Sequence, residues 1–451
     1  MDSENFSLAS FNKKNFFDLV QISPQSLSLF DHLKKLEAKK FVVEKSYVDR
    51  DYLLDYTQYF SRSFDAPKRF TKRVHFFSED FEDNELVRKY LQSPTRDFIK
   101  KLEEEYLGFF VRKPLDSTPI GRTLVIPPEG NGKFPALLPH TVHLFGQELQ
   151  VRSLPYQQQD EAVVKCASTA IWSTLNKLSS IFDIGANLSP AEVRSNAKET
   201  FKGYGKLYPA SGLNILQIID FFKRMGLEVA YQDCDGQPPS MILGNLYSYL
   251  RLGVPILAHV SLGGGKSSSS HLVTLVGYEL DQDSPEFNKA DQICALYAHD
   301  DAIGPFSKVE LNPSKPRRLN CSWNRSDDYS DAYCEEVTLR GLIAPIYHKI
   351  RIPFVPIYRH ITNLKAFKEQ KKLFEDFSIY LTTLVKYKEE VSKFESPEKM
   401  NILTENNPRF LWIARAENGS EARDYLFDAT HHCSPKTVYS SFIGSNAYFK
   451  R

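Results

Sequence analysis

The stretch that decides the fold of this chain is His271–Tyr278, with the sequence HLVTLVGY. Its apolar and β-branched residues predict a strand that begins at the histidine. A second β-prone run, Ile293–Ala298, follows an acidic hairpin and predicts the partner of that strand. Asp300 and Asp301 follow the second run after one residue, His299. We therefore expect a sheet in which a carboxylate lies beside His271.

The alternation of side chains along a strand bears on which of the two acids this is. Leu296, Ala298 and Asp300 share one face of the second strand, and Asp301 falls on the other face. Asp300 thus continues a small or apolar face, as a buried carboxylate that orients His271 should. The choice between Asp300 and Asp301 stays open at this point.

A cysteine opens a helical pattern earlier in the chain. Cys166 begins the run CASTAIW, and an apolar face predicts a helix as far as Leu178. A thiol reacts as its thiolate, and a helix N-terminus stabilises that negative charge. A cysteine before a helix is more often a small buried hydrophobe. The order of Cys166, His271 and Asp300 nevertheless favours a nucleophile, its base and the group that orients the base.

Three adjacent glutamines precede the cysteine. Gln157, Gln158 and Gln159 each carry an amide that can donate a hydrogen bond to the oxyanion formed when a thiolate attacks a carbonyl. We take Gln159 as the first choice, although the sequence does not distinguish the three.

Together these residues resemble the papain-like cysteine peptidases, and most closely their C39-like branch. That branch typically shows a glutamine, a Cys-Gly or Cys-Ala that opens a helix, His-x-Val-x-x-x-Gly-Tyr, and Asp-Pro with a nearby glycine. The resemblance covers about residues 150–310. It rests on Gln159, CASTA at 166–170, GVPI at 253–256, HLVTLVGY at 271–278, and Asp300 with Gly304.

The resemblance implies a papain-like domain with a helical half and an antiparallel β half. It also implies Cys166 as nucleophile, His271 as general base, Asp300 as the residue that orients the base, and Gln159 as oxyanion donor. Asp301 stands where the family usually has proline. The implied chemistry requires neither a metal nor an organic cofactor.

We expect an α+β protein of three parts. Residues 1–145 predict an N-terminal α+β accessory domain, 146–315 the papain-like domain, and 316–451 a C-terminal α+β extension that packs on the catalytic domain. The proline- and glycine-containing stretch 127–139 marks the first boundary.

Within the flanking parts, residues 1–22 read as polar and weakly structured. Ile352–Tyr358 reads as extended, and a long amphipathic helix is expected over about 364–394. The runs at 410–414 and 425–429 are expected to pair as a hairpin.

Composition excludes several classes of protein. A net charge of +1 argues against a dominant nucleic-acid surface. No apolar stretch approaches the length of a membrane span, and Met1–Phe6 is not the start of a signal peptide. The six cysteines show no CxxC spacing. We expect a cytoplasmic protein with reduced thiols.

Two other motifs give weaker indications of function. The loop Gly263–Ser270 has Val260 where a phosphate-binding loop needs glycine, and it reads instead as a flap over the site. His431–Cys433 lacks a second pair of metal ligands.

The expected function is cysteine-dependent hydrolysis of a peptide or isopeptide bond through a thioester. One alternative is acyl transfer to an amine, as in transglutaminases, and another is an inactive papain-like module that binds peptides or proteins. The large flanking parts favour a peptide or protein substrate.

Overall fold

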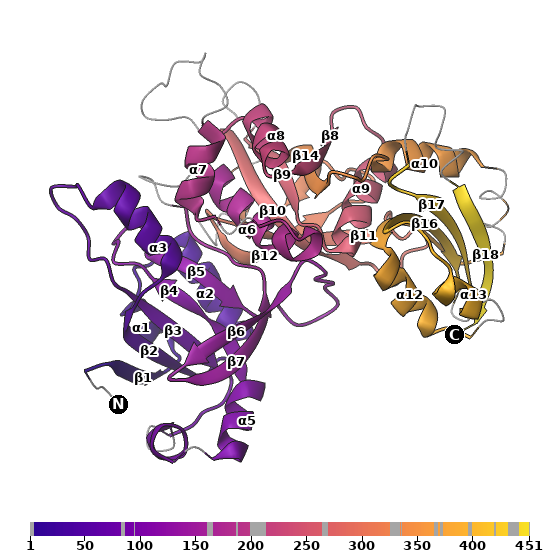
Figure 1. The fold of residues 1–451 in the computed structure, drawn as a ribbon. Helices are drawn as coiled ribbons and strands as arrows, with labels where there is room; N and C mark the ends of the chain where they lie inside the picture. Colours follow the sequence, from indigo (N-terminus) through magenta and orange to yellow (C-terminus); the bar gives the residue numbers. More distant parts are fainter. Residues whose placement is uncertain are drawn as a thin grey trace.

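The computed structural model shows a mixed α and β protein with several antiparallel sheets, which confirms the α+β class. Three units follow one another along the chain in Figure 1, coloured from indigo through magenta to yellow. The structure describes residues 4–82, 86–93, 95–159, 166–185, 188–198, 213–263, 269–324, 334, 336–364, 369, 373–395, 399–418, 421–431 and 442–450. None of the described helices combines the length and apolarity needed to cross a bilayer.

The N-terminal unit is a five-stranded antiparallel sheet whose strands lie side by side in chain order. They are β1 (Phe6–Ser10), β2 (Lys40–Tyr47), β3 (Thr71–Phe77), β4 (Tyr106–Arg112) and β5 (Ile120–Val125). Its helical segments are α1 (Lys13–Phe17), α2 (Pro24–Lys35), α3 (Arg50–Asp55), η1 (Tyr56–Phe60), η2 (Val87–Gln92) and α5 (Arg96–Glu104).

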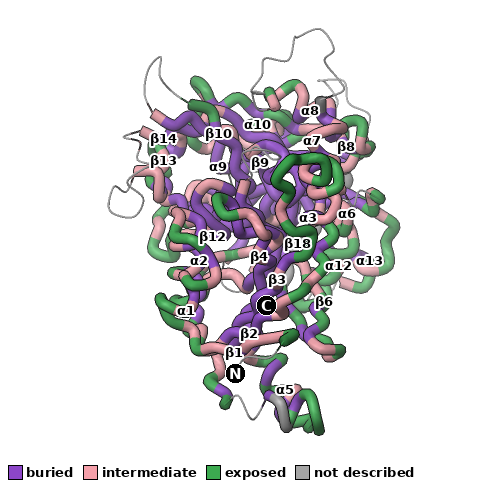
Figure 2. Tube along the Cα trace, turned by 90° about the vertical axis from the view of Figure 1, so that its left-hand side faces the viewer, coloured by how far each residue is buried: buried purple, intermediate pink, exposed green. Residues whose placement is uncertain are grey.

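The expectation that residues 1–22 are weakly structured was wrong. Leu8 and Phe16 are buried, and β1 pairs with β2 along its whole length. The apolar residues that order this segment lie between polar stretches such as Asn12–Asn15, and these polar stretches hid them in the sequence. Figure 2 shows that buried residues follow the strands, while α5 is mostly exposed.

A hairpin connects this unit to the cysteine helix. Strands β6 (Leu138–Leu144) and β7 (Gln147–Ser153) pair with each other and with none of the other described strands. After β7 the chain runs along the N-terminal sheet, where Tyr156 exchanges two backbone hydrogen bonds with Thr123.

The central unit contains a closed ring of six antiparallel strands, with a seventh at its side. Strand β13 pairs with both β12 and β14, and this closes the order β13-β12-β11-β10-β9-β14, while β8 flanks β14. The strands are β8 (Leu227–Asp233), β9 (Ile256–Leu262), β10 (Ser269–Leu280), β11 (Ile293–Asp300), β12 (Gly304–Leu311), β13 (Arg318–Asn320) and β14 (Val337–Tyr347).

Two features of this ring bear on the sequence-based expectations. The predicted pairing of His271–Tyr278 with Ile293–Ala298 is confirmed, because β10 and β11 form an antiparallel ladder. The last two strands of the ring, β13 and β14, lie beyond residue 315, at which the sequence placed the end of the central part.

Four helices accompany the central ring. They are α6 (Cys166–Phe182), α7 (Pro190–Lys198), α8 (Ile215–Arg224) and α9 (Pro239–Leu252). Helix α6 packs on β10 and β9, and Figure 1 shows it between the N-terminal unit and the central strands. Helix α9 ends at Gly253, whose φ of +96° continues the chain in a conformation that costs glycine little.

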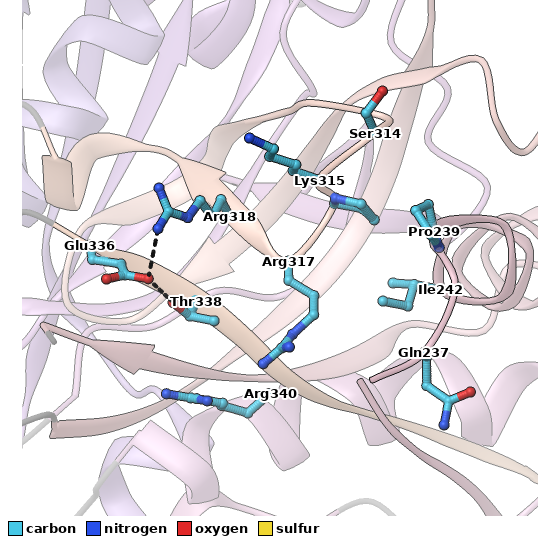
Figure 3. A pocket seen from close by; sticks show the side chains of 11 residues that line it. Gln237, Pro239, Ile242, Ser314, Lys315, Arg317, Arg318, Glu336, Thr338 and Arg340 are labelled. Atoms are coloured by element: carbon cyan, nitrogen blue, oxygen red, sulfur yellow. Dashed lines mark hydrogen bonds and ion pairs between the residues drawn. The ribbon is translucent and has the colours of Figure 1, made fainter. Parts of the chain in front are cut away.

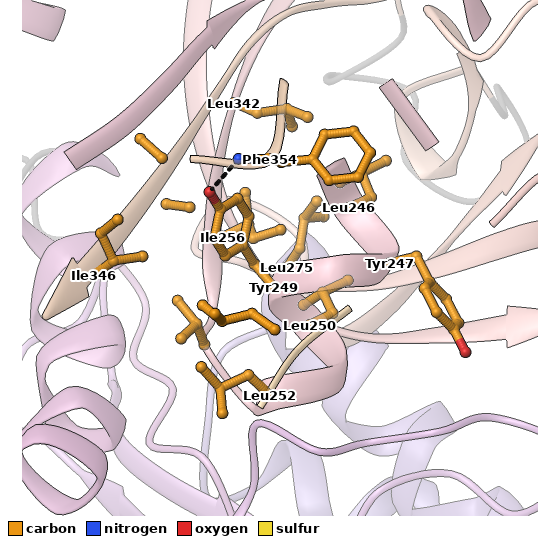
Figure 4. Close-up of a cluster of buried hydrophobic side chains, with 14 of the residues drawn as sticks. Leu246, Tyr247, Tyr249, Leu250, Leu252, Ile256, Leu275, Leu342, Ile346 and Phe354 are labelled. Atoms are coloured by element: carbon orange, nitrogen blue, oxygen red, sulfur yellow. Dashed lines mark hydrogen bonds between the residues drawn. The ribbon is translucent and has the colours of Figure 1, made fainter. Parts of the chain in front are cut away.

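Helix α9 joins the central ring to the C-terminal unit. Most of its residues are buried, and Figure 4 shows Leu246, Tyr249 and Leu250 among side chains from both units. The Tyr249 hydroxyl accepts a hydrogen bond from the Phe354 backbone N–H at 3.2 Å. Ser248 donates to the Ile379 carbonyl at 2.7 Å on the C-terminal side.

The C-terminal unit is a four-stranded antiparallel sheet with helices beside it. Strands β15 (Asp376–Thr383), β16 (Phe410–Glu417), β17 (Glu421–Asp428) and β18 (Phe442–Lys450) lie in chain order. Its helices are α10 (Phe354–Asn363), α12 (Leu384–Ser392) and α13 (Lys399–Thr404). The expected hairpin of 410–414 with 425–429 is confirmed by the β16–β17 ladder.

Two expectations for this unit were wrong. The stretch Ile352–Tyr358 is not extended, because α10 begins at Phe354 directly after Pro353. The long helix over about 364–394 is interrupted by β15, in which Phe377, Ile379 and Leu381 pair with β16. Long-range strand pairing here overrides a helical pattern that the local sequence also permits.

Candidate active site

Cys166 is the first residue of α6, and it is half-buried. The rest of the first turns of this helix is buried, so the helix is fixed by packing. Thr274 on β10 donates its hydroxyl hydrogen bond to the Ala170 carbonyl at 3.1 Å. Because Ala170 lies one turn after Cys166 and Thr274 three residues after His271, this bond ties the cysteine helix to the histidine strand.

His271 lies near the start of β10 and is buried. Its Nε2 is 2.9 Å from Oδ1 of Asp300, and the Cys166 side chain lies close enough to the ring to help raise the pKa of His271. Since Asp300 engages Nε2, Nδ1 is the nitrogen that remains for the thiol. The structure therefore brings the predicted cysteine, histidine and acid together, with a hydrogen bond between the histidine and the acid.

Asp300, the last residue of β11, accepts hydrogen bonds on both oxygens. The Ala302 backbone N–H reaches Oδ1 at 3.0 Å, and the Trp323 indole N–H reaches Oδ2 at 2.7 Å. Burial alone raises the pKa of this carboxyl, but the His271 charge and these hydrogen bonds outweigh burial and lower it. Asp300 is thus held as a carboxylate although it is buried.

The charge of Asp300 acts in turn on His271. Burial opposes the charged imidazolium, but the Asp300 charge and hydrogen bond, together with the Cys166 hydrogen bond, raise the pKa of His271 well above its usual range. A protonated His271 beside the thiol is the partner that a cysteine thiolate requires.

Asp301 takes a different position. Its Oδ1 is 3.9 Å from His271 Nε2, which is too far for a hydrogen bond. Burial and the neighbouring Asp300 charge raise the pKa of Asp301 to about 7, against the opposing effect of His271. Of the two acids left open by the sequence, Asp300 makes the contact with the histidine.

The turn after β11 that carries both acids is held by parts of the chain far away in sequence. The Asp301 carbonyl lies 3.4 Å from two donors, the Gln159 backbone N–H and the Gln25 side-chain amide of α2. A Cβ at Gly304 would overlap the Ser28 side chain, so α2 packs closely on this turn. The N-terminal unit therefore supports the acid that bonds to His271.

The three adjacent glutamines have different surroundings in the structure. Gln158 is engaged by β5, since its backbone N–H donates to the Ile120 carbonyl at 3.1 Å and its side-chain oxygen accepts from the Ile120 N–H at 3.2 Å. Gln157 is buried, and its Nε2 has no hydrogen-bond partner among the described residues. Gln159 is half-buried and adjoins the acid turn. Residues 160–165, which lead to Cys166, lie outside the described part of the chain.

Trp323 is the functional residue that sequence reasoning missed. It lies in the short helical turn η4 (Ser322–Asn324), which follows β13. Its ring centroid is 5.4 Å from that of His271 at an interplanar angle of 67°, so it covers the His271–Asp300 pair while donating to Asp300. A tryptophan within the polar run NCSWN was the available signal.

Within the described ranges, His271, Asp300 and Asp301 are the only group of three side chains placed to share a metal ion. An ion there would replace the His271–Asp300 hydrogen bond and compete with the Trp323 N–H for Asp300. The expected flap includes residues 264–268, and the His431–Cys433 fragment includes 432 and 433; these residues lie outside the described part.

Neither protein-family models nor curated protein sequences match this chain. Function is therefore inferred from the geometry of the site.

Proposed function

We propose that this protein is a papain-like cysteine hydrolase, related in chemistry to the C39-like branch, that cleaves a peptide or isopeptide bond through a thioester on Cys166. The observation that carries the proposal is the buried His271–Asp300 hydrogen bond with the Cys166 side chain beside the His271 ring. This group of residues connects the start of a buried helix with two neighbouring strands. The proposal is also supported by the closed ring of antiparallel strands with a helix packed on it, because a papain-like domain has a β half and a helical half.

Acylation begins with the thiol. His271 holds at Nδ1 the proton that the thiol has given up, and the thiolate sulfur attacks the carbonyl carbon of the scissile amide. The resulting oxyanion is stabilised by the Cys166 backbone N–H and the Gln159 side-chain amide. The C–N bond then breaks, the leaving nitrogen takes the proton from His271, and the acyl group remains as a thioester.

Deacylation uses the same groups in the same order. His271 takes a proton from water, the hydroxide oxygen attacks the thioester carbon, and the oxyanion forms at the same place. The C–S bond breaks, the cysteine sulfur recovers its proton from His271, and a carboxylic acid leaves. Asp300 holds the ring and stabilises the imidazolium in both halves.

The test is the reactivity of Cys166 toward an epoxide-type thiol probe, followed by mass spectrometry of the intact protein and its peptides. Cys294 is the internal control, because it is also half-buried and its pKa is raised by burial and nearby acids. We expect Cys166 to be labelled at least about 10-fold faster than Cys294, and the His271→Ala variant to lose this difference.

Equal labelling of both cysteines, or labelling of Cys166 that does not depend on His271, would favour an inactive papain-like binding module. A thioester that is released faster by an added amine than by water would assign acyl transfer. Labelling that is unchanged by a chelator, and by added zinc, is expected if His271 and Asp300 serve the thiol and not a metal.

A further inference from the structure

A second feature of the central unit is a cationic pocket of about 410 Å³, which lies between the start of α9 and strands β13 and β14. Four of its lining side chains are positively charged and one is a carboxylate. They are Lys315, Arg317, Arg318, Arg340 and Glu336. Such a volume suits a small organic ligand better than a bare ion.

Two of the cations are held in place by the fold. The Arg317 guanidinium donates to Asp235 and, through Nε, to the Leu339 carbonyl at 3.4 Å. Arg340 is the extra residue where the β14–β9 register shifts between Leu339 and Gly341, and its Nη1 lies 3.8 Å from the same Asp235. These two arginines are partly neutralised by one carboxylate.

The positive charges of the other two cations, Arg318 and Lys315, are not neutralised by a close carboxylate among the described residues. Arg318 approaches Glu336 only to 3.9 Å, and both side chains are largely exposed. Water screens so distant a pair, which leaves most of the Arg318 charge available. The Lys315 ammonium has no hydrogen-bond or ion-pair partner among the described residues. Figure 3 shows these cations on one side of the pocket.

The opposite wall is apolar. Pro239 and Ile242 belong to the first turns of α9, and Figure 3 shows them facing the arginines. Pro238, the residue that precedes this helix, provides no side-chain cap. The helix N-terminus therefore adds its positive end to the field of the cations.

A neighbouring pocket does not have this excess of positively charged side chains. It shares Arg340 but is otherwise lined by Asp233, Asp235 and uncharged or hydroxyl side chains around His259, whose pKa is lowered by burial and by Arg340. His259 lies 2.5 Å from the Ser270 hydroxyl. Of these two pockets, only the pocket at α9 has an excess of positively charged side chains.

We propose that the pocket at α9 binds a small ligand with a phosphate or carboxylate head group. The head group lies between Lys315 and Arg318, and the body of the ligand lies against Pro239 and Ile242. The anion is either a free small molecule or an acidic side chain of a peptide. The site is independent of the chemistry at Cys166.

Isothermal titration calorimetry with inorganic phosphate, and separately with a glutamate-rich peptide, tests this site. The double variant Lys315→Gln/Arg318→Gln is compared with Lys349→Gln/Arg359→Gln, which removes the same charge from exposed positions outside the pocket. We expect saturable binding that weakens at least about 10-fold in the first variant and stays unchanged in the second. All titrations are made against chloride at the same ionic strength.

The two arms identify the source of the anion. Saturable binding of phosphate alone assigns a free small molecule, and peptide binding that phosphate displaces assigns an acidic side chain. Heats that do not saturate for either ligand, or equal weakening in both double variants, would overturn the site. Probe labelling of Cys166 in the same samples reports separately on the active site.

Discussion

Two buried histidines in this molecule each bond to a carboxylate, yet their pKa values are shifted in opposite directions. His271 Nε2 lies 2.9 Å from Asp300 in the central ring, and His75 Nε2 lies 3.0 Å from Glu44 in the N-terminal sheet. The pKa of His271 is raised well above its usual range, whereas that of His75 is lowered to about 4.

The surroundings of the carboxylate account for the difference. Burial lowers the pKa of His75, and Arg73, which also bonds to Glu44 at 2.5 Å, opposes the charge of the ring. The other nitrogen of His75 bonds to the Tyr106 hydroxyl at 2.9 Å. No arginine in the described part of the chain bonds to Asp300, whose further donors there are an indole and a backbone N–H.

A histidine–carboxylate contact is therefore not by itself a catalytic sign. The imidazolium is stabilised where the described residues offer the carboxylate no other cation and a thiol lies beside the ring. Where an arginine already neutralises the carboxylate, the histidine is a neutral structural residue. Substitutions in the His271–Asp300 pair and in the His75–Glu44 pair test whether the two histidines differ in this way.

The largest effect is expected for Cys166→Ala. Without the sulfur no thioester forms, so cleavage of a fluorogenic peptide library should fall by roughly 10⁴-fold or more. The half-buried side chain loses one atom, and the melting temperature should change little. Cleavage that continues at the wild-type rate would show that Cys166 is not the nucleophile.

Asp300→Asn, compared with Asp301→Asn, tests which acid serves the histidine. The first change removes the charge that stabilises the imidazolium, and epoxide labelling of Cys166 should slow by about 10²–10⁴-fold. The second replaces a carboxyl with a pKa of about 7 and should have a several-fold effect at most. If Asp301→Asn slowed the labelling of Cys166 more than Asp300→Asn, Asp301 would be the residue that orients His271.

Glu44→Gln should act on stability alone. It leaves the Arg73 guanidinium, which is 9% exposed, without its carboxylate, and unfolding in urea should become easier by about 2–4 kcal/mol. Cys166 labelling should keep its wild-type rate. A loss of labelling in the folded variant would connect the N-terminal sheet to the site.

The two histidines should also differ in how they affect stability with pH. The pKa of His75 is 6.5 in the unfolded chain and about 4 in the folded protein. The neutral ring therefore contributes about 2–3 kcal/mol of stability at neutral pH, and this contribution is lost as the pH falls from 6.5 to 4. For His271 the folded pKa is the higher one, and its contribution is present below 6.5 and lost as the pH rises through the raised pKa.

Melting temperatures from pH 4 to 9 measure both contributions. His75→Gln should flatten the decline on the acid side, and His271→Gln should flatten the decline on the alkaline side. Identical profiles for the two variants would mean that the two pairs do not differ in charge.

The smallest effect is expected for Trp323→Phe. This change keeps a ring over His271 but removes the N–H donor to Asp300, so the pKa of Asp300 should rise and labelling of Cys166 should slow by about 2- to 10-fold. The acid limb of the labelling profile should move to higher pH. An unchanged acid limb would show that the indole only shields the pair.

The parts of the site that could be predicted are those with strong local patterns. The helix at Cys166 and the strands on either side of the acidic hairpin have continuous apolar runs, and the structure forms them where expected. The closure of the ring was not predictable, because β13 is three residues long and has no local pattern. The β15 strand was missed because its pairing with β16 outweighs its helical pattern.

The sequence by itself determined the helix that begins at Cys166, the strand near whose start His271 lies, and the acids that follow the partner strand, because local periodicity specifies these elements. Only the tertiary structure decided that Asp300 and not Asp301 bonds to His271, that Trp323 covers this pair, and that α2 of the N-terminal unit supports the acid turn. These choices depend on long-range packing and on the balance of buried charges, which residues distant in the chain supply.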